Sequence, residues 1–116
     1  MVDYVGAVID EHDLSRIGNG TPTVVQIHDP QCPRCLALQR EARSALSDFE
    51  TGELQYVIAN IRTAQGKALA SRYGVGHVTL LLFDGQGGMR NILAGENTRD
   101  RLRADFRVHL VASGSS

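Results

Sequence analysis

The chain has 116 residues, of which 42% are hydrophobic, and its 12 basic and 13 acidic side chains give a formal net charge of -1. A chain of this length and composition can bury the core of one ordinary domain without disulfides to support it. The balanced charge gives no reason to expect nucleic acid or an anionic membrane surface as a partner. We expect one domain over residues 1–112 and a flexible tail over 113–116.

The N-terminal residues, MVDYVGAVIDEHD, have neither the basic start nor the apolar stretch of a secretory signal. No later stretch approaches the roughly 18 apolar residues of a membrane span. We therefore expect a cytoplasmic protein without membrane contact. In a reducing compartment, two cysteines close in sequence are more often catalytic or metal-binding than a permanent crosslink.

The first third of the chain is predicted to contain two strands and a short helix. Residues 2–9 are mostly apolar and can form an edge strand, and Asp10 can cap a short helix over 11–17. Glycines and Pro22 then interrupt the chain. Residues 23–28 are rich in β-branched side chains and are bounded by turn residues, which predicts a central strand covered on both faces.

The middle of the chain is predicted to continue with helix, strand and helix. From Pro33, apolar side chains recur at steps of three and four residues, which predicts an amphipathic helix that stops near Gly52. Residues 54–61 form a second buried strand. Residues 63–73 form a second helix, which Gly74 ends.

The last third is predicted to form a hairpin and a closing helix. Residues 78–83 are an apolar strand, and a glycine-rich turn leads into a further strand over 89–93. A final helix starts after Asn97. A strand-helix-strand unit followed by a hairpin and a helix predicts an α/β fold, with a central mixed sheet of four to five strands flanked by helices on both faces.

Both cysteines of the chain, Cys32 and Cys35, fall between the predicted central strand and the helix that follows it. A pair of cysteines two residues apart at such a junction indicates redox chemistry or metal binding.

Several stretches together resemble the thioredoxins over nearly the whole chain. They are DPQCPRC around the cysteines, RYGVGHVTLLLF followed by DGQGG, and Gly95 before the last helix. The resemblance implies a thioredoxin-like fold and a thiol-disulfide oxidoreductase whose redox-active centre is the disulfide of Cys32 and Cys35. It implies no other cofactor, a protein disulfide as substrate and a reducing partner, and we expect a monomer.

The chain departs from the thioredoxin pattern around the cysteines. Gln31 stands where thioredoxins have tryptophan, and Pro33 and Arg34 replace the glycine and proline between the cysteines. Gln26 and Ile58 stand where the family buries an acid and a lysine behind the second cysteine.

A second departure concerns the family's cis-proline, whose loop lies against the cysteines and helps to hold the substrate chain. Val78 occupies its place here, and the preceding loop is one residue shorter. Because a cis bond before a residue other than proline costs about 3 to 4 kcal/mol, we predict a trans peptide between His77 and Val78. Arg40 likewise replaces the proline that kinks the active-site helix, so we expect a straighter helix.

In the redox interpretation, Cys32 is the attacking thiolate, because the start of a helix stabilises negative charge. Pro33 suits the first helical turn, and the charge of Arg34 is expected to favour the thiolate. Cys35, one turn deeper, is the resolving thiol. Gln31 borders the approach to Cys32, and His77 lies in the loop that faces the cysteines.

Two alternatives remain open from the sequence. Cys32, Cys35 and His77, with His28, a substrate or a second subunit completing the set, can hold zinc or an iron-sulfur cluster. The domain can also be an interaction module with incidental cysteines.

Overall fold

The computed structural model describes residues 11–50 and 52–112. The edge strand expected over residues 2–9, the capping residue Asp10 and the tail expected over 113–116 lie outside the described residues.

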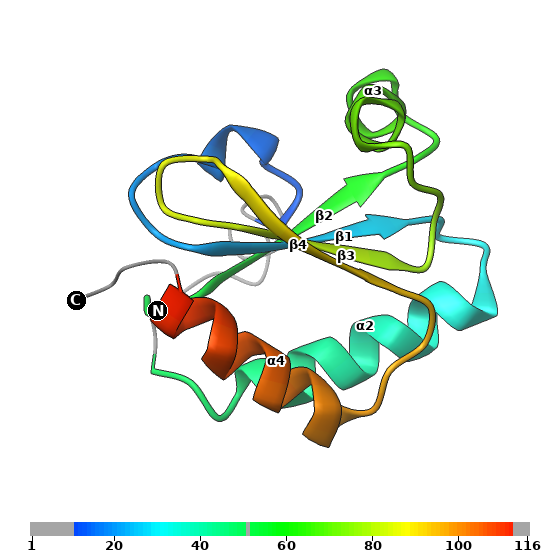
Figure 1. Cartoon of the computed structure of the whole chain (residues 1–116). Helices are drawn as coiled ribbons and strands as arrows, with labels where there is room; N and C mark the ends of the chain where they lie inside the picture. The colour runs from blue at the N-terminus through cyan, green and yellow to red at the C-terminus, as the bar shows by residue number, and fades with distance from the viewer. Residues whose placement is uncertain (1–10, 51, 113–116) are drawn as a thin grey trace, which may run out of the picture.

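The described residues contain a four-stranded mixed sheet (Figure 1). Its strands are β1 (Thr23–His28), β2 (Gln55–Asn60), β3 (Thr79–Phe83) and β4 (Met89–Ala94), in the order β2-β1-β3-β4. Strand β1 pairs parallel with β2 and antiparallel with β3, and β3 pairs antiparallel with β4. The predicted mixed sheet with residues 23–28 as a central strand is therefore confirmed.

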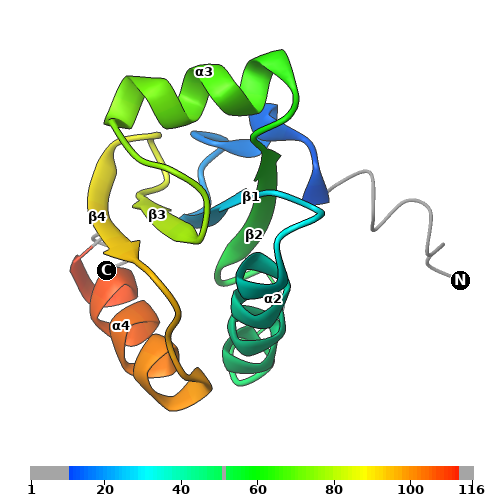
Figure 2. The same cartoon turned by 90° about the vertical axis from the view of Figure 1, so that its right-hand side faces the viewer.

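Helices cover both faces of this sheet, as the sequence predicts. Helices α2 (Pro33–Leu46) and α4 (Arg99–Ala112) lie together on one face, and α3 (Ala64–Tyr73) lies on the other (Figures 1 and 2). The core is divided accordingly. On β1, Val24 belongs to the cluster beneath α2 and α4, whereas Val25 and Ile27 belong to the cluster beneath α3. This alternation follows from the two-residue period of a strand.

The short helix expected over residues 11–17 is found as a shorter 3-10 helix, η1 (Leu14–Arg16). The carboxylate of Asp13 accepts hydrogen bonds from the backbone N–H and the hydroxyl of Ser15, at 3.0 and 2.6 Å. Asp13 is thus the N-cap that starts η1. Ile17 is already extended, so no α-helical turn follows.

Helix α2 also ends earlier than the expected stop near Gly52, because Ser47 caps it directly after Leu46. The Ser47 hydroxyl donates to the carbonyl of Ser44 at 2.6 Å, and the Ser47 N–H donates to the carbonyl of Arg43 at 3.1 Å. A serine hydroxyl that bonds to a backbone carbonyl in this way weakens the helical pattern. The apolar residue Phe49 beyond the cap still packs against the core from the loop.

Helix α3 has the boundaries that the sequence predicts. The hydroxyl of Thr63 accepts from the N–H of Gly66 at 3.0 Å, and Gly74 ends the helix with a left-handed φ of 66°. Gly66 faces the backbone of Asn60 at the end of β2, and a Cβ on Gly66 would overlap the Asn60 carbonyl group. The absence of a side chain at Gly66 thus allows α3 to approach the sheet.

We predict that Gly66→Ala destabilises the fold by about 1 to 3 kcal/mol, because overpacking forces the backbone of α3 away from β2. The sign of this stability change is diagnostic, because replacing glycine by alanine at an unobstructed helix position stabilises a protein by up to about 1 kcal/mol. Gly76→Ala is the matched control, because a Cβ at Gly76 meets no atom within 4 Å. The midpoints of urea unfolding measure both variants, and a Gly66→Ala protein as stable as wild type would contradict the close approach.

Candidate redox site

Cys32 is the residue that caps the N-terminus of α2. Its Sγ atom accepts a hydrogen bond from the backbone N–H of Cys35 at 3.3 Å, and its own N–H donates to the carbonyl of Asp29 at 3.0 Å. Pro33 occupies the first helical position, where a missing N–H costs no helical bond. Both cysteines are free thiols, with Cys32 partly buried and Cys35 buried. The expected placement of both cysteines and Pro33 at the helix start is confirmed.

The surroundings of the two sulfurs separate their pKa values. Desolvation raises the pKa of Cys32, but hydrogen bonds from the Cys35 side chain and from the backbone N–H groups of Cys35 and Arg34 outweigh it, so the net pKa is lowered. Burial raises the pKa of Cys35, and the neighbouring Cys32 adds to this rise. The pair therefore shares its charge unequally, with Cys32 as the preferred thiolate.

Arg34 forms an ion pair at the start of α2. Its guanidinium Nε donates to a carboxylate oxygen of Glu96 at 3.2 Å, and both side chains are more than half exposed. The backbone N–H of Arg34 also helps to lower the pKa of Cys32. The ion pair joins the first turn of α2 to the loop before α4.

Gln31 belongs to a polar cluster on the turn that leads into Cys32. Its N–H donates to Oδ1 of Asp29 at 3.0 Å, and its side-chain Oε1 accepts from Nη2 of Arg62 at 3.1 Å. Nε of Arg62 also donates to Oδ1 of Asp29 at 2.8 Å, and this contact lowers the pKa of the Asp29 carboxyl. Gln31 is exposed and directly precedes Cys32 in the chain.

The loop before β3 carries the residues expected to face the cysteines. No described residue has a cis peptide bond, so the predicted trans peptide between His77 and Val78 is confirmed. Val78 has a left-handed φ of 59°, which is rare and strained for a β-branched residue. Its N–H donates to the carbonyl of Ile27 at 3.1 Å, and its carbonyl accepts from the N–H of Gly95 at 2.8 Å.

The Val78 side chain is 4% exposed and packs in the same apolar cluster as Cys35, with the partly buried Cys32 against it. Hydrogen bonding from the backbone of Asp29 and of Val78 partly offsets the burial that raises the pKa of Cys35. The loop thus lies against the dithiol, as the resemblance implies. Because the Val78 N–H is bonded to Ile27, it is not available to a substrate chain.

His77 is exposed and lies beside both sulfurs. Its ring nitrogen and the Sγ atoms of Cys32 and Cys35 all lie within 4.8 Å of one another. The orientation expected for His77 is therefore confirmed. His28, offered as a fourth ligand by the sequence, is not part of this group.

A buried hydrogen-bond network lies directly behind Cys35. The side chain of Gln26 is fully buried, and its Nε2 donates to the carbonyl of Cys35 at 2.9 Å. Its Oε1 accepts from the hydroxyl of Tyr56 at 2.7 Å. A buried amide whose partners are all in place holds the first turn of α2 against β1.

His28 completes this network. Its Nδ1 lies 3.0 Å from Nε2 of Gln26, and because this amide nitrogen can only donate, Nδ1 accepts and the proton of the neutral ring is on Nε2. Burial, and to a smaller extent the charges of His12 and Arg43, lower the pKa of His28, whereas Asp29 raises it. His28 is therefore a neutral structural residue whose hydrogen-bond partner is Gln26.

Sequence reasoning missed Arg62, Tyr56 and Glu96 as parts of the site. The parallel register of β1 and β2, with His28 opposite Asn60, places the loops after the two strands side by side. A parallel pairing of these two strands would have indicated that Arg62 and Asp29 lie close together. Tyr56 gave no signal in the sequence, because its hydroxyl matters only once Gln26 is known to be buried. Glu96 becomes relevant only through its ion pair with Arg34.

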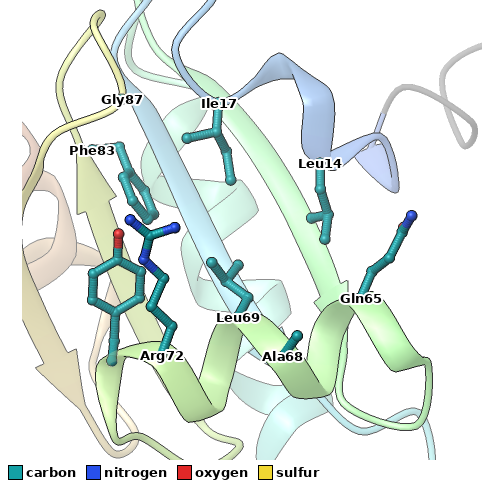
Figure 3. Close-up of a pocket in the computed structure, with 9 residues that line it drawn as sticks. Leu14, Ile17, Gln65, Ala68, Leu69, Arg72, Phe83 and Gly87 are labelled. Atoms are coloured by element: carbon teal, nitrogen blue, oxygen red, sulfur yellow. The ribbon is translucent and has the colours of Figure 1, made fainter.

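A surface cavity of about 420 Å³ lies away from the cysteines, between η1 and α3 (Figure 3). Figure 3 shows Leu14 and Ile17 on one side and Leu69 on the other, with the Arg72 side chain alongside. Neither cysteine lines this cavity, so it is separate from the dithiol.

Comparisons with protein-family models and with curated proteins each found no match. Solved structures do match. A thioredoxin from Fasciola hepatica has a TM-score of 0.64 at 18% identity, with 79% of this chain and 84% of that chain covered. An uncharacterised thioredoxin-like protein from Clostridium perfringens has a TM-score of 0.69 at 19% identity, with 89% of this chain and 79% of that chain covered.

The fold and the position of the cysteine pair place this chain in the class of thioredoxin-fold proteins with a C-x-x-C site. It is a divergent example, with the sequence C-P-R-C and valine in place of the cis-proline. None of the helices within residues 11–50 and 52–112 has the length and hydropathy to cross a membrane.

We predict that Val78→Pro destabilises the protein by about 2 to 4 kcal/mol, because proline cannot adopt the positive φ and cannot donate to the Ile27 carbonyl. Val78→Gly is the matched control, since glycine keeps the N–H and tolerates this φ. Its lost apolar burial, about 1.5 to 3 kcal/mol, is offset by released strain of about 1 to 3 kcal/mol. Chemical denaturation compares the two, and equal stability of the variants would contradict the role of the Val78 backbone.

We also predict that the free energy of unfolding falls as the pH is lowered below about 6.5. His28 has a lowered pKa in the folded protein, so it takes up a proton more readily in the unfolded chain, and acid therefore favours unfolding. This contribution is fully present above the unfolded pKa and is lost as the pH falls toward the lowered folded pKa. The slope is at most about 1.4 kcal/mol per pH unit. His28→Asn, whose amide oxygen can accept from Gln26, should show a shallower fall between about pH 7.5 and 5.5 in urea unfolding. An identical pH profile in both proteins would refute the assignment.

Proposed function

We propose that this protein is a thiol-disulfide oxidoreductase that reduces protein disulfides. The observation that carries the proposal is the position of the two cysteines at the N-terminus of α2, where Sγ of Cys32 accepts the N–H of Cys35 at 3.3 Å and Cys35 is buried. This geometry lowers the pKa of Cys32, whereas burial raises the pKa of Cys35. An accessible thiolate next to a protonated, buried second thiol is the arrangement that disulfide exchange requires.

In the first step, the Cys32 thiolate attacks one sulfur of the substrate disulfide. A mixed disulfide forms between Cys32 and the substrate, and the other substrate sulfur leaves as a thiolate. Backbone N–H groups at the start of α2 stabilise the Cys32 thiolate before this attack. Gln31 and Arg62 border the path by which the substrate approaches.

In the second step, Cys35 loses its proton and attacks Sγ of Cys32. The Cys32–Cys35 disulfide forms, and the second substrate sulfur is released, so two electrons have passed from the dithiol to the substrate. The amide of Gln26 cannot take the proton of Cys35, because it has no ionisable group and its polar atoms are already bonded. Water or the departing substrate thiolate is the proton acceptor in this proposal.

The cycle requires a reducing partner that converts the Cys32–Cys35 disulfide back to the dithiol. A protein disulfide substrate and such a partner are the interactions we propose, with the chain acting as a monomer in the cytoplasm. The reduction needs no cofactor besides the two cysteines.

The proposal predicts that mild oxidation takes the metal-free protein from two free thiols to none, as counted by a colorimetric thiol assay. Cys35→Ser should accumulate a mixed disulfide with a model substrate through Cys32, because the resolving thiol is missing. Mass spectrometry of the trapped adduct identifies the cysteine that carries the substrate.

Insulin reduction in the presence of dithiothreitol measures the activity of the same variants. Cys32→Ser should lower the rate to that of the Cys32→Ser/Cys35→Ser double variant, which serves as the blank. Reductase activity that survives in Cys32→Ser, or two thiols that stay unpaired after oxidation, would disprove the proposal.

A further inference from the structure

Within residues 11–50 and 52–112, one group of three side chains is placed to hold a metal ion: Cys32, Cys35 and His77. We propose that the reduced protein binds one Zn²⁺ ion through the Sγ atoms of both cysteines and a ring nitrogen of His77. Binding itself is independent of the proposed oxidoreductase function, and only the regulatory consequence described below rests on that function.

The distances are close to those of a zinc site. Zinc bonds of about 2.3 Å to sulfur and about 2.0 Å to nitrogen place tetrahedral ligand atoms about 3.5 to 3.8 Å apart. The three atoms already lie within 4.8 Å of one another, so no separation must shrink by more than about 1.3 Å. His77 is exposed, so its ring can rotate toward the sulfurs, which the capped end of α2 holds.

The backbone around His77 supports this placement. The next residue, Val78, is anchored by its N–H to Ile27 and by its carbonyl to Gly95, at 3.1 and 2.8 Å. The loop that carries the imidazole is thus fixed to the strand that leads to the cysteines. Holding a ligand on anchored backbone reduces the entropy that metal binding must overcome.

The donor set favours zinc over a hard cation or an iron-sulfur cluster. Two thiolates and one imidazole suit Zn²⁺, whereas Mg²⁺ and Ca²⁺ require oxygen ligands and a cluster requires more cysteines than this pair. The other nearby polar groups are engaged, because Nδ1 of His28 accepts from Gln26 and the Asp29 carboxylate binds Arg62. Three protein ligands leave the fourth tetrahedral position for water or an incoming thiolate.

Zinc occupancy and disulfide formation exclude each other, because both use the same two sulfur atoms. When a substrate disulfide oxidises the zinc-bound pair, two electrons pass to the substrate, which leaves as two thiolates. The Cys32–Cys35 disulfide forms, and Zn²⁺ is released with its charge unchanged. Zinc would thus inhibit the dithiol, and a disulfide would release the metal.

The test uses Co²⁺ as a spectroscopic substitute for Zn²⁺, added to the reduced full-length protein under anaerobic conditions. We expect tetrahedral d–d absorption and thiolate-to-cobalt charge transfer, saturating at one Co²⁺ per chain and displaced by Zn²⁺. Absence of these bands, or saturation at one Co²⁺ per two chains, would overturn the single-chain site.

Two histidine variants then assign the third ligand. His77→Ala should weaken Co²⁺ binding by about 100-fold or more, since even residues that only support a ligand contribute 10- to 100-fold. His12→Ala is the matched control, because His12 is exposed and lies outside the three-residue group, and its affinity should equal that of wild type. Equal affinity in His77→Ala and wild type would overturn the role of His77.

The two proposals fail in distinguishable ways. If the wild-type protein binds no Co²⁺ but its two thiols still oxidise to a disulfide, the zinc proposal is wrong and the oxidoreductase proposal stands. If the protein binds Co²⁺ but forms no Cys32–Cys35 disulfide, the oxidoreductase proposal is wrong and the zinc proposal stands.

Discussion

The burial of β1 on both faces and along both edges is the constraint on which the rest of this structure depends. All six residues from Thr23 to His28 are buried, and the strand pairs with β2 on one side and β3 on the other. No polar side chain on it can turn to bulk water, so each must find a partner inside the protein. Gln26 meets this requirement by bonding to the carbonyl of Cys35, and the end of the strand thereby fixes the start of the helix that carries the dithiol.

An amide in this buried position gives the site a different electrostatic character from that of a buried acid. The side chain of Gln26 carries no charge at any pH, and its partners Tyr56 and His28 are held neutral, since burial raises the pKa of Tyr56 and lowers that of His28. The charge behind Cys35 therefore stays constant while the sulfurs change state. The unequal pKa values of the cysteines then come from helix capping and burial.

The sheet, its flanking helices and the place of the cysteines could be predicted because their signals are local. Strand β1 and helix α3 have the expected bounds, since turn residues flank the strand and Thr63 and Gly74 cap the helix. The contacts of Tyr56 and Glu96 could not be predicted, because they join segments far apart in the chain. Only the parallel pairing of β1 with β2 could have indicated that Arg62 lies near Asp29. The early end of α2 at Leu46 is not signalled by the apolar spacing, because Phe49 continues that spacing although it lies in the loop.

The left-handed backbone at Val78 has an evolutionary consequence. A single codon change to proline would not turn this loop into that of an ordinary thioredoxin, because the N–H of residue 78 is bonded to Ile27 and its φ is positive. A proline at position 78 would therefore have to be accompanied by further changes in the loop that remove the positive φ and the bond to Ile27. The substitution alone yields a destabilised protein, which selection disfavours.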